Sequence, residues 1–167
     1  EQAHPVGTVT HYRADGYDLI EGRLAVGRTA APLVIRQLLG QASQTGHTII
    51  DCPPGTSCSM VTAVRDADYT ILVSEATAFG LQDLSLAVNT MRKLGRRFGV
   101  IINRADLGNE RVRRYCEDEA IPLHLEIPFS REVAQAVANG LTMLAGAPGL
   151  AEQLNTVLAD IGSGMPA

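Results

Sequence analysis

The chain has 167 residues, of which 46% are apolar and 19% are charged, a composition typical of one globular domain and unlike that of a disordered segment. The formal net charge is −4, so charge gives no reason to expect nucleic acid or an anionic membrane as a partner. No apolar run approaches the roughly 20 residues of a membrane span, and three cysteines without repeated spacing do not indicate a disulfide framework. We therefore expect a reduced, cytoplasmic protein without a membrane span.

The first predicted elements are two extended segments, Val6–Arg13 and Tyr17–Leu24, joined across Ala14-Asp15-Gly16. This pattern predicts a β-hairpin or two edge strands. A helix is predicted next, over Ala31–Ala42, with Pro32 near its first turn, where the missing N–H costs nothing.

From residue 47 onward, short apolar runs alternate with helical patterns. Nearly continuous apolar runs are typical of parallel strands that are covered on both faces, and they occur at His47–Cys52, Tyr69–Ser74, Phe98–Asn103 and Leu123–Ile127. Apolar periodicity and capping residues predict helices at residues 79–95, Asn109–Ala120, Arg131–Asn139 and Leu150–Ile161. The alternation predicts an α/β fold in one domain over residues 1–167, a doubly wound, mostly parallel sheet with flanking helices.

The basic residues are almost all arginines. Arginine occurs thirteen times and lysine once, at Lys93 near the end of a predicted helix. A phosphate-binding P-loop requires a glycine-rich turn followed by Lys and Ser or Thr, because backbone N–H groups surround the phosphates while the ammonium reaches the terminal ones. No Gly-Lys-Ser or Gly-Lys-Thr occurs, so we expect no P-loop within this chain.

Asp51 follows the run Thr48-Ile49-Ile50, at the expected carboxyl end of a strand, where ligands bind in open α/β sheets. A carboxylate there can hold a hydrated Mg²⁺ through a water. Pro53-Pro54 restrict the turn that follows, and Gly55 lets the backbone approach a terminal phosphate. The alternative is an Asp that caps an ordinary turn, but the Pro-Pro-Gly sequence favours the magnesium site.

A second polar segment, Asn103-Arg104-Ala105-Asp106, also follows an apolar strand. The Asn103 amide carries a donor and an acceptor side by side and can read a purine edge, while Asp106 can accept from an exocyclic amine. The alternative is a polar turn in which Asp106 serves Gly108-Asn109 as a turn former. Because this segment lies at the expected sheet edge after the Asp51 motif, we favour a contact with a base.

Four segments together resemble the second half of a MinD/ParA/Mrp-type P-loop ATPase: IIDCPPGTSC, ILVSEATAFGLQDL, FGVIINRADLGNERV and LHLEIPFSREVAQAVANG. The resemblance is strongest to the subgroup that carries an inserted ferredoxin-like domain with two 4Fe-4S clusters. In that subgroup the lead-in EGRLAVGRTAAPLVIRQL follows the ferredoxin insert, so residues 1–30 correspond to a lead-in hairpin. The resemblance implies a partial P-loop NTPase fold of the SIMIBI type.

The resemblance also implies roles for single residues. Asp51 corresponds to the magnesium-linked aspartate of the switch II segment, and Gly55 to its phosphate-sensing glycine. Asn103 and Arg104 would face the adenine, and the backbone near Pro128 would close the base pocket.

For the complete protein, the resemblance implies a homodimeric ATPase that uses ATP and Mg²⁺ and works with an iron–sulfur or redox partner, in iron–sulfur assembly or electron transfer. The P-loop and the ferredoxin cysteines do not occur in this chain. We therefore expect this chain to be the C-terminal portion, inactive alone and without a tightly bound cofactor, with the 4Fe-4S clusters on the ferredoxin portion.

The cysteines allow two interpretations. Cys58 lies seven residues after Asp51, the offset at which the related nitrogenase iron protein places one ligand of its intersubunit cluster, and thiolate ligation is chemically possible. Cys52 could be a further cluster ligand only if its side chain pointed in the same direction as that of Cys58. The alternative, a small buried thiol or a helix-start residue, is favoured because residues 1–50 contain no second cysteine. Cys116 is predicted to lie in the core.

Two other functions stay open. One is a non-catalytic interaction domain that keeps the sheet and binds partners through its helices, which the absent Gly-Lys-Ser/Thr motif would favour. The other is a GTP-binding switch, because Asn103-Arg104-Ala105-Asp106 approaches the Asn-Lys-x-Asp guanine reader. Arginine in place of lysine favours ATP.

Overall fold

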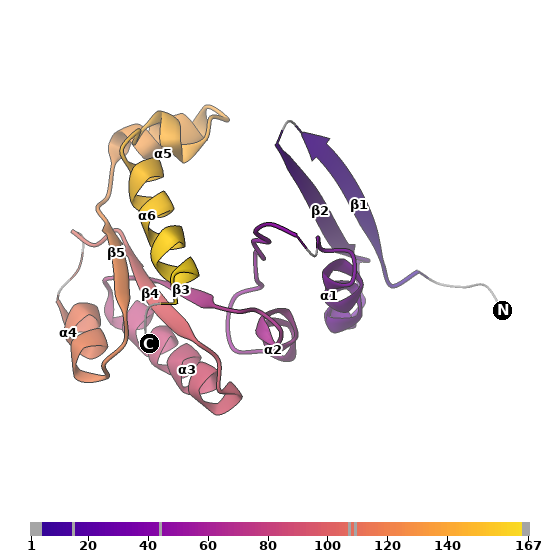
Figure 1. Cartoon of the computed structure of the whole chain (residues 1–167), viewed down its shortest axis with the longest axis horizontal. Coiled ribbons are helices and arrows are strands. Elements are labelled where there is room, and N and C mark those ends of the chain that lie inside the picture. The colour runs from indigo at the N-terminus through magenta and orange to yellow at the C-terminus, as the bar shows by residue number, and fades with distance from the viewer. Residues whose placement is uncertain (1–4, 15, 44, 107, 109, 165–167) are drawn as a thin grey trace. The chain divides into compact units, whose positions relative to one another are not determined.

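The structure is a computed structural model, and it describes residues 5–14, 16–43, 45–106, 108 and 110–164 (Figure 1). The chain divides into two compact units, residues 1–67 and residues 68–167. The expected single domain over residues 1–167 stays a prediction.

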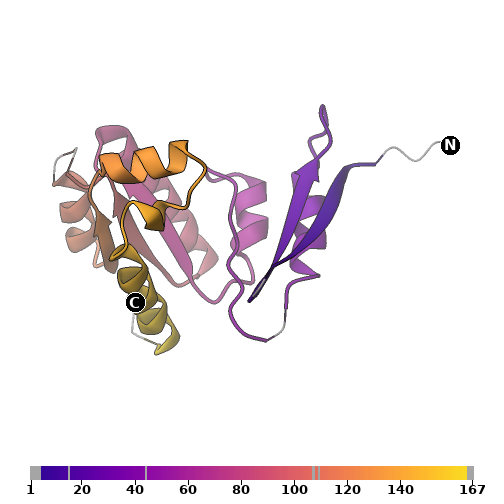
Figure 2. The same cartoon turned by 90° about the horizontal axis from the view of Figure 1, so that it is seen from above.

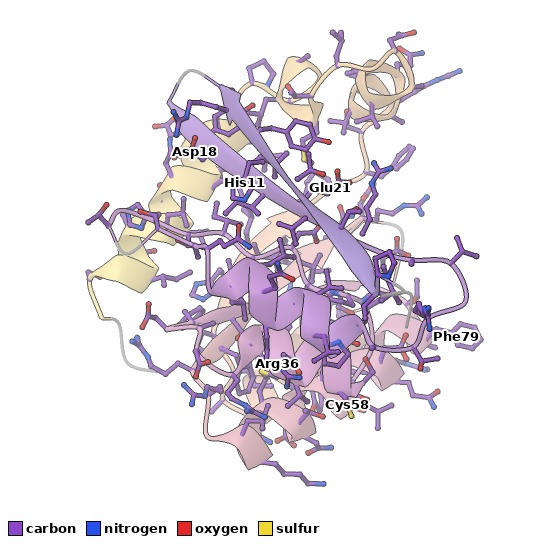
Figure 3. The ribbon with its side chains drawn as sticks, turned by 90° about the vertical axis from the view of Figure 1, so that its right-hand side faces the viewer. His11, Asp18, Glu21, Arg36, Cys58 and Phe79 are labelled. Carbon is purple, nitrogen blue, oxygen red and sulfur yellow. The ribbon has the colours of Figure 1, made fainter. Side chains whose placement is uncertain are left out.

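The N-terminal unit begins with an antiparallel β-hairpin, which confirms the predicted one. Strand β1 (Gly7–Ala14) pairs with β2 (Tyr17–Leu24), from Gly7 opposite Leu24 to Ala14 opposite Tyr17. Gly16 supplies a φ of +92° in the connecting turn, a conformation that glycine adopts without a steric penalty. His11, Asp18 and Glu21 extend from the two strands (Figure 3).

Helix α1 (Ala31–Leu39) packs against the hairpin, and Pro32 occupies its first turn as predicted. The close approach depends on Gly22 of β2, because a Cβ there would lie 2.7 Å from both the Val34 and the Leu38 side chains. Val34 is buried. A short helix, α2 (Cys58–Val64), follows in the same unit; no helix was predicted there, although a helix start was one interpretation of Cys58.

The prediction of a strand at His47–Cys52 is wrong. Residues 47–53 are neither strand nor helix, and the two described sheets consist of β1-β2 and β3-β4-β5. Ile49 is 83% exposed. An apolar run becomes a strand only where a neighbouring strand pairs with its N–H and C=O groups, and the segment has no such partner among the described residues.

The C-terminal unit contains a three-stranded parallel sheet in the order β3-β4-β5. Its strands are β3 (Thr70–Glu75), β4 (Phe98–Asn103) and β5 (Leu123–Ile127). These confirm three of the four predicted strands, with β3 displaced by one residue. The fold is therefore α/β, with a parallel sheet in one unit and an antiparallel hairpin in the other.

Helices α3 (Ala78–Leu94) and α4 (Arg111–Asp118) cover one face of this sheet, as the views in Figures 1 and 2 show. Side chains from both helices, from β4 and from the loops that carry Ala76 and Ile121 form one buried cluster: Ala76, Leu84, Val88, Val100, Ile102, Val112, Cys116 and Ile121. The predicted core position of Cys116 is confirmed. Strand alternation turns Ile101 to the opposite face, where it is buried on the side of the sheet on which α6 (Leu150–Gly162) lies.

Two further elements complete the unit. Helix α5 (Arg131–Ala138) begins where predicted, and the Ser130 Oγ accepts the Val133 N–H at 3.1 Å as its cap. A 3₁₀ turn, η1 (Met143–Ala145), was not predicted. None of the helices in the described part of the chain is long and apolar enough to cross a membrane.

Candidate functional site

The carboxyl ends of the three parallel strands meet at one edge of the sheet. Glu75 of β3 pairs in register with Asn103 of β4, and Asn103 pairs with Ile127 of β5. The residues that follow each strand therefore leave the sheet side by side. This edge is where ligands bind in open α/β folds.

A hydrogen bond links the Asn103 side chain to the Arg104 backbone at this edge. The Asn103 Oδ1 accepts the Arg104 backbone N–H at 3.0 Å, so the amide nitrogen of Asn103 is left as a donor. Arg104 has a φ of +53°, which is uncommon for a non-glycine residue and costs about 1–3 kcal/mol. Such a conformation persists only where neighbouring contacts hold it.

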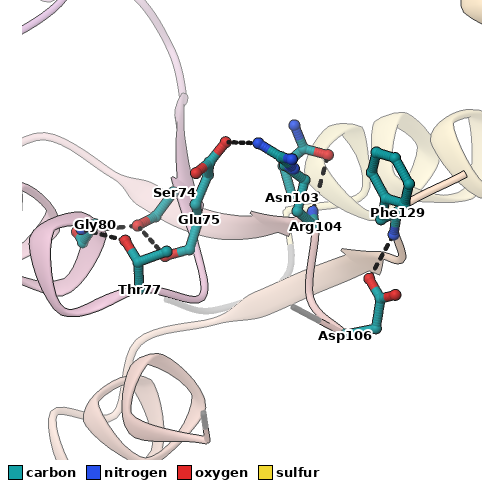
Figure 4. A network of polar contacts seen from close by, with 8 residues as sticks. All are labelled: Ser74, Glu75, Thr77, Gly80, Asn103, Arg104, Asp106 and Phe129. Atoms are coloured by element: carbon teal, nitrogen blue, oxygen red, sulfur yellow. Dashed lines mark hydrogen bonds and ion pairs between the residues drawn. The ribbon is translucent and has the colours of Figure 1, made fainter. Parts of the chain in front are cut away.

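Two side chains hold the Arg104 guanidinium (Figure 4). Its Nη1 lies 3.5 Å from the Glu75 Oε1, and its Cζ lies 5.4 Å from the centre of the Phe129 ring. The first contact is an ion pair and the second is within the range of a cation–π interaction. The Arg104 side chain therefore lies at the strand ends, between Glu75 of β3 on one side and Phe129, after β5, on the other.

Asp106 joins the loops after β4 and β5. Its Oδ1 accepts the backbone N–H of Phe129 (Figure 4), and the Ala105 N–H donates to the Ile127 C=O at 3.0 Å. Pro128, predicted to close a base pocket, is exposed between these two connections. The other interpretation of Asp106, as a turn former for Gly108-Asn109, involves Asn109, which lies outside the described residues.

The loop after β3 is ordered by hydroxyl groups. The Ser74 Oγ donates to the Gly80 C=O at 3.0 Å, and the Thr77 Oγ1 accepts the Gly80 N–H at 2.9 Å (Figure 4). Gly80 is required here, because a Cβ would overlap the Glu75 carbonyl and would lie 3.0 Å from the Ser74 Oγ. These contacts fix the backbone that carries Glu75.

A cavity lies behind the loop that follows β4, and its polar walls include Glu110, Arg113 and Glu126. Arg113 donates to both carboxylate oxygens of Glu126, at 2.7 and 3.3 Å, and these bonds raise the pKa of Arg113. Because Arg113 and Glu126 satisfy each other, the cavity offers little unpaired charge to a ligand.

Asp51 and Gly55 belong to the N-terminal unit. Asp51 is exposed, and its carboxylate accepts no hydrogen bond from the residues that the structure describes. Gly55 has a φ of +82°, and the space where a Cβ would lie is open, so the glycine is needed for conformation and not for room. A carboxylate on an exposed, proline-stiffened loop fits a water-linked magnesium, because Mg²⁺ keeps most of its waters.

Cys52 and Cys58 lie on either side of this loop. Cys52 is half-buried, its Sγ donates to the Ile50 C=O at 3.7 Å, and its pKa is raised by burial and by the nearby Asp51 carboxylate. Cys58 is exposed at the start of α2 (Figure 3), which confirms the helix-start interpretation. Within the described residues, no three His, Cys, Asp or Glu side chains are grouped so as to hold a metal ion.

The structure brings Asn103, Arg104, Asp106 and Pro128 together in the C-terminal unit, whereas Asp51, Gly55 and Cys58 are described with the N-terminal unit. Two residues at the edge were missed. Glu75 carried the same signal as Asp51, an acidic residue that ends an apolar run, and Phe129 follows directly after Pro128.

No protein-family model matches this chain. Two proteins of Methanocaldococcus jannaschii are similar to it. The uncharacterized protein MJ0579 is 24% identical over 141 residues, which cover 83% of this chain and 49% of that protein. The uncharacterized protein MJ0578 is 24% identical over 130 residues, which cover 77% and 45%. The chain thus spans about half the length of these curated relatives.

Proposed function

We propose that this chain supplies the switch II and base-recognition segments of a MinD/ParA/Mrp-type ATPase with a partial SIMIBI-type P-loop fold. The observation that carries the proposal is the single sheet edge at which Glu75, Asn103 and Ile127 end three adjacent parallel strands. Asn103 ends β4 and Arg104 follows it, and both would face the adenine, while the backbone near Pro128, after β5, would close the base pocket.

In this proposal Asp51 holds the hydrated Mg²⁺ of a bound nucleotide through a water, and Gly55 senses the terminal phosphate. The exposed Asp51 carboxylate and the positive φ of Gly55 support these roles. The two prolines between them limit the conformations of the loop, so that gain or loss of the phosphate can switch it between discrete states.

The activity belongs to the complete protein. There, a P-loop from outside this sequence would bind the phosphates, and hydrolysis would drive rearrangement of a homodimer in the cytoplasm. Metal electrostatics and positioning would supply the catalysis, because the sequence of this chain offers no evident general base. The proposed process is iron–sulfur assembly or electron transfer with a redox partner, and the 4Fe-4S clusters would lie on a ferredoxin portion.

The test is a calorimetric titration of this chain, and of the complete protein, with ATP and GTP, each with and without Mg²⁺. We expect this chain to bind the triphosphates only weakly, through the base and below the range of calorimetry, and we expect tight, Mg²⁺-dependent binding of ATP to the complete protein. Asp51→Ala in the complete protein should abolish the Mg²⁺ dependence, with Asp18→Asn on the hairpin surface as the control. Unchanged affinity and switching in Asp51→Ala would contradict the proposal, and preference for GTP would favour the GTP-binding alternative.

The second candidate function is a non-catalytic interaction domain. It is favoured by apolar side chains on the surface of the C-terminal unit, where Phe79 is 82% exposed, Val73 67% and Leu141 58%. A complete protein that binds no nucleotide would support this alternative.

A further inference from the structure

Arg104 and Phe129 form a paired surface at the strand ends. The Arg104 side chain is 46% exposed and Phe129 is 44% exposed, so a flat cation and a flat ring both reach solvent while contacting each other. Bases stack on aromatic rings and on guanidinium planes, and each stacked base contributes about 1–3 kcal/mol. The pair is therefore chemically suited to a purine ring.

Neither member of the pair is positioned by burial. Arg104 is held through its side chain by Glu75, and Phe129 is held through its backbone by Asp106. Glu75 and Asp106 thus act from opposite sides of the pair, one from the end of β3 and one from the loop after β4. Removal of either carboxylate would leave one half of the surface without its support.

From these contacts we propose that Glu75 and Asp106 are positioning residues, which hold Arg104 and Phe129 as a stacking surface for the base of a nucleotide. This inference rests on the proposed function and adds Glu75 and Phe129 to the base site. It also changes the role of Asp106, which supports the surface and does not read guanine.

The hydrogen bond at Asp106 supports the inference that this residue does not read guanine. A guanine reader of the Asn-Lys-x-Asp type uses both carboxylate oxygens, because the guanine edge presents two neighbouring donors. In this structure one of them, Oδ1, already accepts the Phe129 N–H. The Asn103 amide nitrogen is left as a donor, and both purines carry ring-nitrogen acceptors that could take its hydrogen bond. Asp106 is thus engaged in supporting Phe129, and we expect the surface to make no contact that requires guanine.

The experiment uses the ¹⁵N-labelled full chain, titrated with AMP and with GMP, with ribose 5-phosphate as the control for phosphate binding. Amide shifts of residues 103–106 and 129 report the base site. We expect AMP to shift these amides, and GMP to bind with an affinity no higher than that of AMP. Glu75→Gln and Asp106→Ala should each lower the affinity for both nucleotides by about threefold or more. A loss of this size corresponds to part of the free energy that one stacked base contributes.

Matched variants separate positioning from general damage. Asp106→Asn keeps an acceptor oxygen for the Phe129 N–H and should restore most of the affinity. Glu119→Gln breaks a comparable half-exposed ion pair with Arg92 in the same unit and should change neither affinity. The ratio of AMP to GMP affinity should be the same in all four variants.

Three outcomes overturn the inference. If Asp106→Ala and Asp106→Asn lower the affinity for GMP alone, Asp106 reads guanine. If AMP binds at the edge and none of the variants weakens it, the positioning roles fail while the base site of the proposed function stands. If neither nucleotide shifts residues 103–106 or 129, the inference and the base-recognition part of the proposed function fail together.

Discussion

Gly99 lies between two side chains that bond across the middle strand of the parallel sheet. The Tyr69 hydroxyl and the His124 Nε2 are 2.7 Å apart, and their rings meet edge to face at 5.6 Å. Tyr69 precedes β3 and His124 lies in β5, so this bond passes over Gly99 of β4 and is possible only because Gly99 has no side chain.

Gly99→Ala should therefore destabilise the protein. A Cβ at this position would lie 2.6 Å from the Tyr69 hydroxyl and would overlap the His124 ring, so the bond must break. We expect a loss of about 1–3 kcal/mol in the free energy of unfolding, the range for overpacking, measured by urea denaturation. Gly162→Ala, at the end of α6 and with open space around its Cβ position, is the control. Equal stability of Gly99→Ala and the wild type would show that the bond between Tyr69 and His124 does not stabilise the protein.

His124 should make the stability pH-dependent. Burial lowers the pKa of His124, while the Asp160 carboxylate acts in the opposite direction. The Tyr69 hydroxyl bonds to this ring, and the Arg97 guanidinium lies over the Tyr69 ring. Because the folded pKa lies below the unfolded value of about 6.5, the unfolded state binds more protons. The contribution of His124 is complete above about pH 6.5 and is lost as the pH falls toward the folded pKa.

The measurement is the free energy of unfolding between pH 8 and pH 5 for the wild type and His124→Gln. The wild type should lose more stability than the variant as the solution is acidified below about pH 6.5. Parallel losses in the two proteins would show that protonation of His124 is not linked to folding.

At the scale of elements, helix α3 has signals at both ends. The Thr77 Oγ1 caps the N-terminus through the Gly80 N–H, and Gly95 ends the helix in the left-handed conformation with a φ of +62°. Arg92 and Lys93 lie in the last turn, where positive charge is favourable. The agreement of these signals explains why the predicted helix and the observed one coincide so closely.

Thr77→Ala should destabilise α3 by about 1 kcal/mol, the usual cost of losing an N-cap hydroxyl. The free energy of unfolding measured in urea checks this value, and Thr77→Ser should recover most of it. Ser57→Ala is the matched control, because Ser57 precedes α2 without a side-chain capping bond. A larger loss at Ser57 than at Thr77 would argue against the capping mechanism.

At the scale of the whole molecule, the C-terminal unit contains its own buried cluster. All eight members lie between Ala76 and Ile121, and Ile102 among them is 1% exposed. A unit with a continuous core of this kind can fold by itself. Among the described residues, the N-terminal unit has fewer buried side chains, which include Val34, Met60 and Val64.

A fragment of residues 68–167 should therefore unfold cooperatively in urea, followed by circular dichroism. Ile102→Ala in this fragment should cost about 2–5 kcal/mol, because it leaves a cavity in a fully buried position. Leu86→Ala, where the side chain is 51% exposed on α3, should cost far less. A fragment that shows no cooperative transition would mean that residues 1–67 are needed for folding.

Local patterns determined most elements of this chain. The continuous apolar runs of β4 and β5, the cap and αL glycine of α3, and the turn between β1 and β2 act over a few residues, so the sequence alone was enough to locate them. The segment His47–Cys52 contains a short apolar run, as β4 does, and yet forms no strand. The difference is the neighbour, since a strand is stabilised by hydrogen bonds from residues that are distant in the chain.

The site divides in the same way. Asn103, Arg104, Asp106 and Pro128 were recognisable because polar residues directly after apolar strands reach the carboxyl edge of a parallel sheet. Only the tertiary structure joined Arg104 to Glu75 and Phe129, and Asp106 to the Phe129 backbone, because those contacts depend on strand order and register. The sequence by itself thus determined which residues lie at the edge, whereas the tertiary structure decided which of them hold one another, since pairing between strands is a long-range interaction that no local pattern encodes.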